Sequence, residues 1–115
     1  MLNLPLSQTA LIRGQSATLT ATNALPGEQV FFLYTLNGVG AGPAVPQLGG
    51  LELDLLSPVE VLGNSAADAS GQADFTAFVP ASAPLVPVWT QAVIARGAGG
   101  SESVKSPFVE AVIQP

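Results

Sequence analysis

The sequence predicts an all-β fold, an antiparallel two-sheet sandwich of about seven or eight short strands. Short segments alternate between apolar and polar residues, and turns rich in Gly, Pro, Asn and Asp recur along the chain. No segment free of Gly and Pro keeps the apolar spacing that a helix needs. The 115 residues are enough for one hydrophobic core, so residues 1–115 are interpreted as a single domain.

The first half of the chain contains two clear strands. Residues 15–22 alternate strictly, with Ala17, Leu19 and Ala21 on one face and Ser and Thr on the other, which predicts a half-buried strand. A Pro26-Gly27 turn precedes residues 29–35, which are apolar on both faces and are therefore expected to form a central strand. Residues 38–50 are too rich in Gly and Pro for the interior of a ladder and predict a long surface loop.

The second half of the chain is punctuated by a polar turn and by prolines. The turn is expected over residues 64–71, and a linker is expected from Pro80 to Pro87. The predicted strands in this half lie near residues 51–55, 59–62, 72–79, 88–95, 103–105 and 108–113.

Composition excludes several classes of protein. The chain has no Cys and no His, which removes disulfides, thiol and imidazole catalysis, and zinc sites built from these residues. Three basic residues against eight acidic ones give a formal net charge of -5, so nucleic acid and anionic membrane surfaces are not expected partners. No apolar run reaches the roughly 20 residues of a membrane-spanning helix. Residues 1–6 lack the features of a signal peptide, so we expect no membrane insertion and no export signal in this chain.

Turn motifs in three places resemble bacterial immunoglobulin-like modules of secreted and cell-surface proteins. The segments are Leu-Ile-Arg-Gly-Gln-Ser-Ala-Thr-Leu-Thr at 11–20, Leu-Pro-Gly-Glu-Gln-Val at 25–30 and Ala-Asp-Ala-Ser-Gly-Gln-Ala at 67–73. The resemblance covers most of the chain and implies an immunoglobulin-like Greek-key sandwich, export, and a stalk, adhesive or assembly role. It also implies that the positions around Ala44 and Glu52 can carry a cysteine pair, which this chain lacks.

Acidic residues near the predicted polar turn are the only candidate metal ligands. Asp68 and Asp74 could supply oxygen atoms to calcium, which takes about six to eight of them, but their spacing is not that of an EF-hand loop. Asp68 is better explained as a turn residue that bonds its own backbone, with Gly71 at the positive-φ position. We therefore expect no cofactor, with calcium as the one ion that the sequence leaves open.

Other polar combinations have ordinary structural interpretations. Glu52 and Asp54 alternate with leucines, as the solvent face of a half-buried strand does. Adjacent residues of a strand point to opposite faces, so Lys105 is not expected to form a dyad with its serine neighbours and is interpreted as an edge charge. The glycines at 38–42 are not followed by Lys-Ser/Thr or by a helix, so they do not predict a phosphate loop. The sequence therefore predicts that the protein is not an enzyme.

Segments 29–35, 88–95 and 108–113 are apolar on both faces, whereas a two-layer sandwich buries only one face of each sheet. Two explanations remain open: an interface covers the second face, or the loops at 38–50 and 80–87 fold over it. The candidate core or interface residues are Val30, Phe32, Tyr34, Trp89, Val93, Phe108 and Val112.

These observations predict a non-catalytic extracellular or cell-surface module that serves as a structural or self-association unit. Its expected partners are other copies of itself or neighbouring protein domains. The alternative is a carbohydrate-binding or adhesive module of the same fold, which would hold a polysaccharide on Tyr34 or Trp89 with Gln91 or Asp54 beside it.

Overall fold

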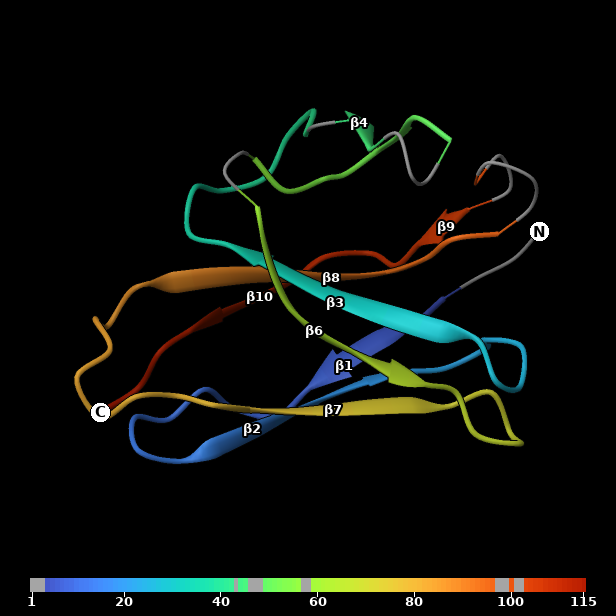
Figure 1. Cartoon of the computed structure of the whole chain (residues 1–115). Helices are drawn as coiled ribbons and strands as arrows, with labels where there is room; N and C mark the ends of the chain where they lie inside the picture. The colour runs from blue at the N-terminus through green and yellow to red at the C-terminus, as the bar shows by residue number, and fades with distance from the viewer. Residues whose placement is uncertain (1–3, 43, 46–48, 57–58, 97–99, 101–102) are drawn as a thin grey trace.

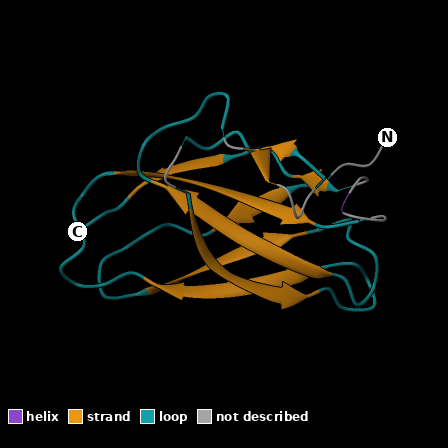
Figure 2. Cartoon of the chain, turned by 45° about the horizontal axis from the view of Figure 1, so that its top comes forward, coloured by secondary structure: helices purple, strands orange, loops and turns teal. Residues whose placement is uncertain are grey.

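The computed structural model describes residues 4–42, 44–45, 49–56, 59–96, 100 and 103–115, in which antiparallel strands form two facing sheets (Figure 1). One sheet has the order β1-β2-β7, and the other has the order β10-β8-β3-β6 with β9 also paired to β8. A short β4-β5 hairpin lies outside both sheets (Figures 1 and 2). The strands are β1 (Leu6–Gln8), β2 (Ser16–Ala21), β3 (Gln29–Thr35), β4 (Ala44–Val45), β5 (Leu51–Glu52), β6 (Glu60–Ala66), β7 (Ala73–Phe78), β8 (Pro87–Ile94), β9 (Val104–Lys105) and β10 (Val109–Val112).

The all-β, antiparallel prediction is confirmed, and most strands lie where the alternation placed them. Strands β2, β3, β7, β8, β9 and β10 agree with their predicted bounds to within one residue at each end. Strand β3 is central, between β6 and β8, as its two apolar faces indicated. No α-helix occurs among the described residues. That part of the chain therefore contains no helix that could cross a membrane.

Four local predictions are wrong, and one strand was not predicted. Strand β6 continues through Ala66 because Asn64 to Ala66 pair with β3, and a register shift beside Phe32 and Leu33 accommodates the extra residue. The predicted turn therefore begins later, at Asp68. The predicted strand at 51–55 is a ladder only over β5, and the predicted loop at 38–50 contains β4. Strand β1 was not predicted, because three residues after a proline carry too little alternation.

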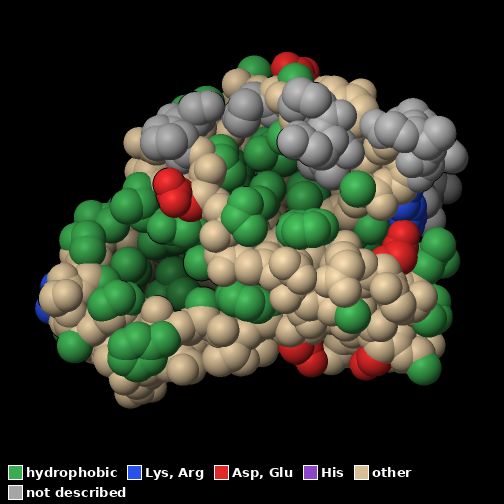
Figure 3. Space-filling model, viewed as in Figure 1, with side chains coloured by type: hydrophobic (Ala, Val, Ile, Leu, Met, Phe, Trp, Pro, Cys, Tyr) green, Lys and Arg blue, Asp and Glu red, His purple; other side chains and the backbone are tan. Residues whose placement is uncertain are grey.

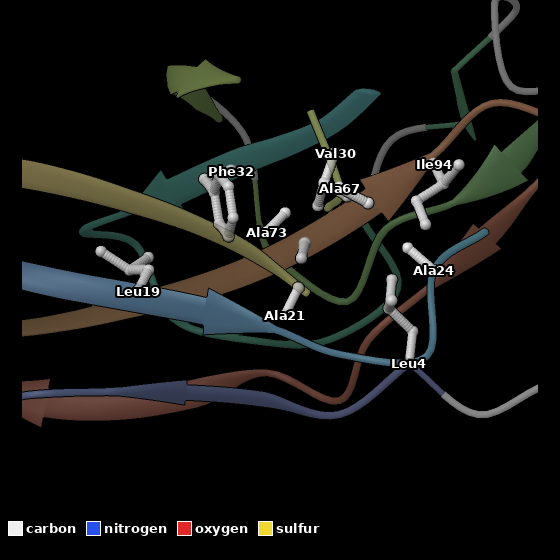
Figure 4. Packing of buried hydrophobic residues seen from close by; sticks show 10 residues of the cluster. Leu4, Leu19, Ala21, Ala24, Val30, Phe32, Ala67, Ala73 and Ile94 are labelled. Atoms are coloured by element: carbon white, nitrogen blue, oxygen red, sulfur yellow. The ribbon is translucent and has the colours of Figure 1, made fainter. Parts of the chain in front are cut away.

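The main core lies between the two sheets (Figure 4). Val30 and Phe32 of β3 are fully buried against Leu19 of β2, and the ring of Phe32 stacks on Phe75 at a centroid distance of 5.7 Å. Gly63 of β6 lies against the Phe75 ring, where a Cβ atom would overlap it. The alternation of β3 therefore sends Val30, Phe32 and Tyr34 toward the opposing sheet.

A second core cluster closes one end of the sandwich. Leu11, Ala17 and Val88 are buried here with Ala83 and Ile113. A parallel bridge between Ile12 and Gln114 joins the segment before β2 to the segment after β10 at this point. Ala83 belongs to the 80–87 linker, so that linker packs into this cluster, and none of its residues belongs to the cluster on the outer face of the larger sheet.

The outer face of the larger sheet is covered by residues 38–42, 44–45 and 49–56, called here the covering segment (Figure 1). Leu53 and Leu55 are buried against Leu33 of β3 and Val93 of β8, with Phe31 and Trp89 packed around them. The segment is a closed structure, because Gly40 and Gly42 donate backbone hydrogen bonds to Asp54 and Leu53, and Leu56 donates to Gly38. The covering segment therefore accounts for the apolar outer faces of β3 and β8.

The β4-β5 hairpin at the tip of the covering segment pairs Ala44 directly with Glu52. These are the two positions around which the resemblance to immunoglobulin-like modules implies a cysteine pair. Directly opposed residues of an antiparallel pair have Cα atoms about 4.5–5.5 Å apart, which lies within the range that a disulfide spans. The hairpin of this chain is held without that cross-link.

Candidate functional site

Polar side chains beneath the covering segment form a clamp that we define as Asp54, Gln91, Lys105 and Ser106. The fully buried Gln91 accepts a hydrogen bond on Oε1 from the Asp54 N–H at 3.1 Å. Its Nε2 donates to Asp54 Oδ2 at 2.9 Å and to the Ser106 carbonyl at 2.7 Å. Lys105 Nζ donates to Asp54 Oδ1 at 3.0 Å and to the Glu52 carbonyl at 2.7 Å. The polar clamp thus ties β8 and β9 to the covering segment.

The polar clamp shows where three residues singled out in the sequence lie: Asp54, Lys105 and Ser106. Asp54 was expected to face solvent beside Glu52, but its carboxylate turns toward Gln91 because the chain leaves the ladder after β5. Lys105 stands on a two-residue edge strand, as expected, but its amine also holds the covering segment. The Ser106 hydroxyl accepts from the Ala92 N–H and donates to the Pro107 carbonyl, so it is engaged in structural hydrogen bonds.

The turn at Asp68 has the geometry expected of a residue that bonds its own backbone. Asp68 Oδ1 accepts hydrogen bonds from the Ser70 N–H and hydroxyl and from the Gln72 N–H. The Ser70 hydroxyl, followed by the backbone bonds, holds the pKa of Asp68 below its usual value. Gly71 has φ +82, as predicted, and its backbone lies against the Ala24 carbonyl.

The calcium candidates Asp68 and Asp74 are not brought into one ligand set. Asp74 accepts two hydrogen bonds from the Gln72 side-chain amide, so Gln72 lies between the two carboxylates. Within the described residues, no group of three or more acidic side chains is gathered as metal ligands. A calcium site stays an untested prediction.

The described residues contain two ion pairs. One is the contact of Lys105 with Asp54, and the other joins Arg96 to Glu28. Arg96 Nη2 and Nε donate to the two carboxylate oxygens at 2.6 and 2.7 Å. This bidentate contact lowers the pKa of Glu28 and raises that of Arg96. Glu28 also accepts from the Leu25 N–H, so the pair joins the end of β8 to the turn before β3.

The seven candidate core or interface residues separate into three groups. Val30, Phe32 and Val93 are buried in the core. Tyr34 and Trp89 are half-buried, Tyr34 between the sheets and Trp89 at the covering segment. Phe108 and Val112 remain 42% and 51% exposed. Only the last two present large apolar side chains to solvent.

A cleft of about 230 Å³ opens between the two sheets, where Figure 3 shows apolar side chains around a hollow. Leu62 of β6 and Phe78 of β7 line it from opposite sheets, and Val88 and Ile113 also belong to the lining. The polar residues of its lining are Gln8, Tyr34 and Thr90, and no Asp, Glu, Lys or Arg belongs to the lining. Sequence reasoning did not find this cleft, because its walls come from strands far apart in the chain.

Comparison with protein-family models, with curated proteins and with solved structures finds no match for this chain. The fold and the site geometry above are therefore the basis for the functional proposals.

Proposed function

We propose that the chain is a non-catalytic, immunoglobulin-like module of a bacterial secreted or cell-surface protein, and that it serves as a structural and self-association unit. The sheet orders β1-β2-β7 and β10-β8-β3-β6, together with the parallel bridge from Ile12 to Gln114, support the immunoglobulin-like assignment. The non-catalytic role is supported by the use of Asp54, Lys105 and Ser106 in the polar clamp.

The observation that carries the association role is the uncovered apolar edge at β10. Phe108 and Val112 are exposed there, and the ladder of β10 pairs with β8 alone among the described strands. An edge strand presents unpaired backbone N–H and C=O groups, so a second copy can continue the sheet by strand addition. The outer faces of β3 and β8 do not form this interface, because the covering segment already packs on them.

Charge opposes close contact between copies. Each chain carries a formal net charge of -5, and Glu110 stands in the middle of β10. Repulsion between like-charged copies is screened by salt, over a Debye length of about 10 Å at 0.1 M. Self-association is therefore expected to be weak at low ionic strength and to strengthen when salt is added.

Sedimentation equilibrium over a wide dilution range tests the association surface. We expect a salt-strengthened dimer with a dissociation constant of roughly tens of micromolar, as small interfaces give. Changing Phe108→Ser together with Val112→Thr is expected to weaken the dimer by about tenfold or more. The measured quantity is the dissociation constant of each variant.

The matched control is Leu25→Ser with Val61→Thr, because these side chains are 57% and 62% exposed, lie in the turn before β3 and on the opposite edge β6, and do not line the cleft. The control is expected to leave the dimer unchanged. A larger loss in the control than in the β10 variant would move the interface to the other side of the sandwich. A monomer at every concentration and salt level would contradict the self-association role.

Carbohydrate binding has no specific observation in its favour. The amide of Gln91 is already used by the polar clamp, and Trp89 packs in the cluster under the covering segment. A sugar platform would therefore have to rest on Tyr34, inside the cleft, without the polar neighbours that the sequence suggested.

A further inference from the structure

The cleft between the sheets combines an apolar lining with two side chains, Tyr34 and Gln8, that each carry a hydrogen-bonding group without a partner among the described residues. Tyr34 projects from β3 into the lining, and its hydroxyl has no hydrogen-bond partner among the described residues. Residues other than this tyrosine supply mainly aliphatic and proline side chains to the walls. An apolar cleft with a few convergent polar groups is the usual form of a small-molecule site.

The polar groups of the cleft are neighbours. Tyr34 pairs with Thr90 across β3 and β8, and the Thr90 hydroxyl donates to Gln8 Oε1 at 2.6 Å. The Nε2 of Gln8 is buried and has no partner among the described residues. Burying an unpartnered donor is unfavourable, so this wall retains hydrogen-bonding capacity that the described protein does not use.

We propose that this cleft binds a small neutral molecule with an apolar body and one acceptor oxygen, such as a ketone, which accepts a hydrogen bond from the Tyr34 hydroxyl. The volume sets the size of the ligand: a cavity of about 150 Å³ holds benzene, so about 230 Å³ suits roughly nine or ten non-hydrogen atoms. Phe108 and Val112 do not belong to the lining, so the proposal does not depend on self-association.

The absence of charged residues from the lining argues for a neutral ligand. An anion entering the cleft would lose hydration without gaining a cationic partner, and the chain as a whole is acidic. Arg96 is paired with Glu28 and Lys105 with Asp54. Arg13 donates to the carbonyl of Ala83, which is a lining residue, but Arg13 itself does not belong to the lining. Fatty acids and phosphates are therefore disfavoured.

Two probes of equal size separate the apolar and polar parts of the site. Acetophenone carries the acceptor oxygen, and 2-phenylpropene replaces that oxygen with a methylene group. Both are titrated into the wild-type protein and followed by the NMR signal of the Tyr34 ring and by the backbone amides of Ala77 and Val88. Tyr34 is the sole tyrosine of the chain, and Trp89, the sole tryptophan, belongs to a different cluster and serves as the internal reference.

We expect acetophenone to bind with a dissociation constant of about 1 mM, typical of a ligand of this size. Tyr34→Phe is expected to weaken acetophenone by about fivefold, the effect of one hydrogen bond, and to leave 2-phenylpropene within about twofold. For each probe the dissociation constant of the variant is divided by that of the wild type, so the difference in hydrophobicity between the two probes cancels. The amide signals report binding in this variant, which lacks the tyrosine ring.

Ala77→Leu provides the second variant, because Ala77 lines the cleft from β7 and a leucine side chain would fill it. It is expected to abolish binding of both probes while retaining the folded amide spectrum. Equal weakening of both probes by Tyr34→Phe would overturn the role of the hydroxyl. Failure of both probes to shift the wild-type cleft signals, or unchanged binding in Ala77→Leu, would overturn the site.

Discussion

Replacing Leu55 with alanine is expected to lower the free energy of unfolding by about 3 kcal/mol, as removal of a fully buried leucine does. Leu55 has no exposed surface and packs with Leu33 and Val93 between the covering segment and the larger sheet. The loss is large beside the roughly 5–15 kcal/mol that stabilises a domain of ordinary size. Chemical denaturation of the wild type and the variant measures it directly.

Leu25→Ala is the control for that measurement. Leu25 is 57% exposed in the turn before β3, so its truncation is expected to change the free energy of unfolding by less than about 0.5 kcal/mol. If both variants lost the same small amount, Leu55 would not be part of the core, and the covering segment would be a loosely attached loop.

Gln91→Met is expected to cost about 2–4 kcal/mol, because it removes the polar centre of the clamp while keeping a side chain of similar length. The substitution leaves the Asp54 N–H and the Ser106 carbonyl without their partner on Gln91. Thermal or chemical unfolding provides the measurement. Ser106 is itself buried, so its carbonyl has little water available as a replacement.

The matched control for the clamp is Gln29→Met, since Gln29 is an exposed glutamine at the start of β3 in the same sheet. Its substitution is expected to be nearly neutral. A neutral result for Gln91→Met as well would show that the clamp does not stabilise the fold, and that the apolar contacts of Leu53 and Leu55 hold the covering segment by themselves.

The strands of the two sheets could be predicted because their alternation is local. In β2, apolar and polar residues alternate at every position, and the structure buries Leu19 and Ala21 in the main core and Ala17 in the second cluster. In β3, apolar residues on both faces correctly indicated a central position. The bounds of β6 could not be predicted, because its register shift depends on the pairing with β3.

The covering segment could not be predicted from its own composition. Its glycines and prolines resemble those of an exposed loop, and only two residues of its Leu51-to-Leu55 stretch form a ladder. The sequence signal for a covering layer lay in β3 and β8, because both strands are apolar on the outer face as well as on the inner face. The sequence left two explanations for that face, and packing of Leu53 and Leu55 decides between them.

The polar clamp and the cleft depend on contacts between residues far apart in the chain. Asp54 and Gln91 are separated by 37 positions, so no local pattern connects them. A glutamine within the apolar strand β8 was nevertheless a usable signal, because a buried amide requires partners. The cleft gave no such signal, since its apolar walls have the same sequence pattern as a filled core.

Coverage of the outer face also decides which surfaces remain for function. With β3 and β8 covered, the exposed side chains of Phe108 and Val112 are the part of the predicted interface set that a partner can reach. The cleft that contains Tyr34 lies between the sheets instead. Association and ligand binding can therefore be tested with separate variants.

Native-state hydrogen exchange of the covering segment tests this account most directly. The informative amides are those of Gly40, Gly42, Asp54 and Leu56, which donate hydrogen bonds that close the segment or attach it to Gln91. If the segment is a layer of the fold, these amides exchange only through global unfolding, with the same protection as the amides of β3. Rapid exchange of these amides while β3 stays protected would contradict the account, because the apolar outer face would then be available as an interface.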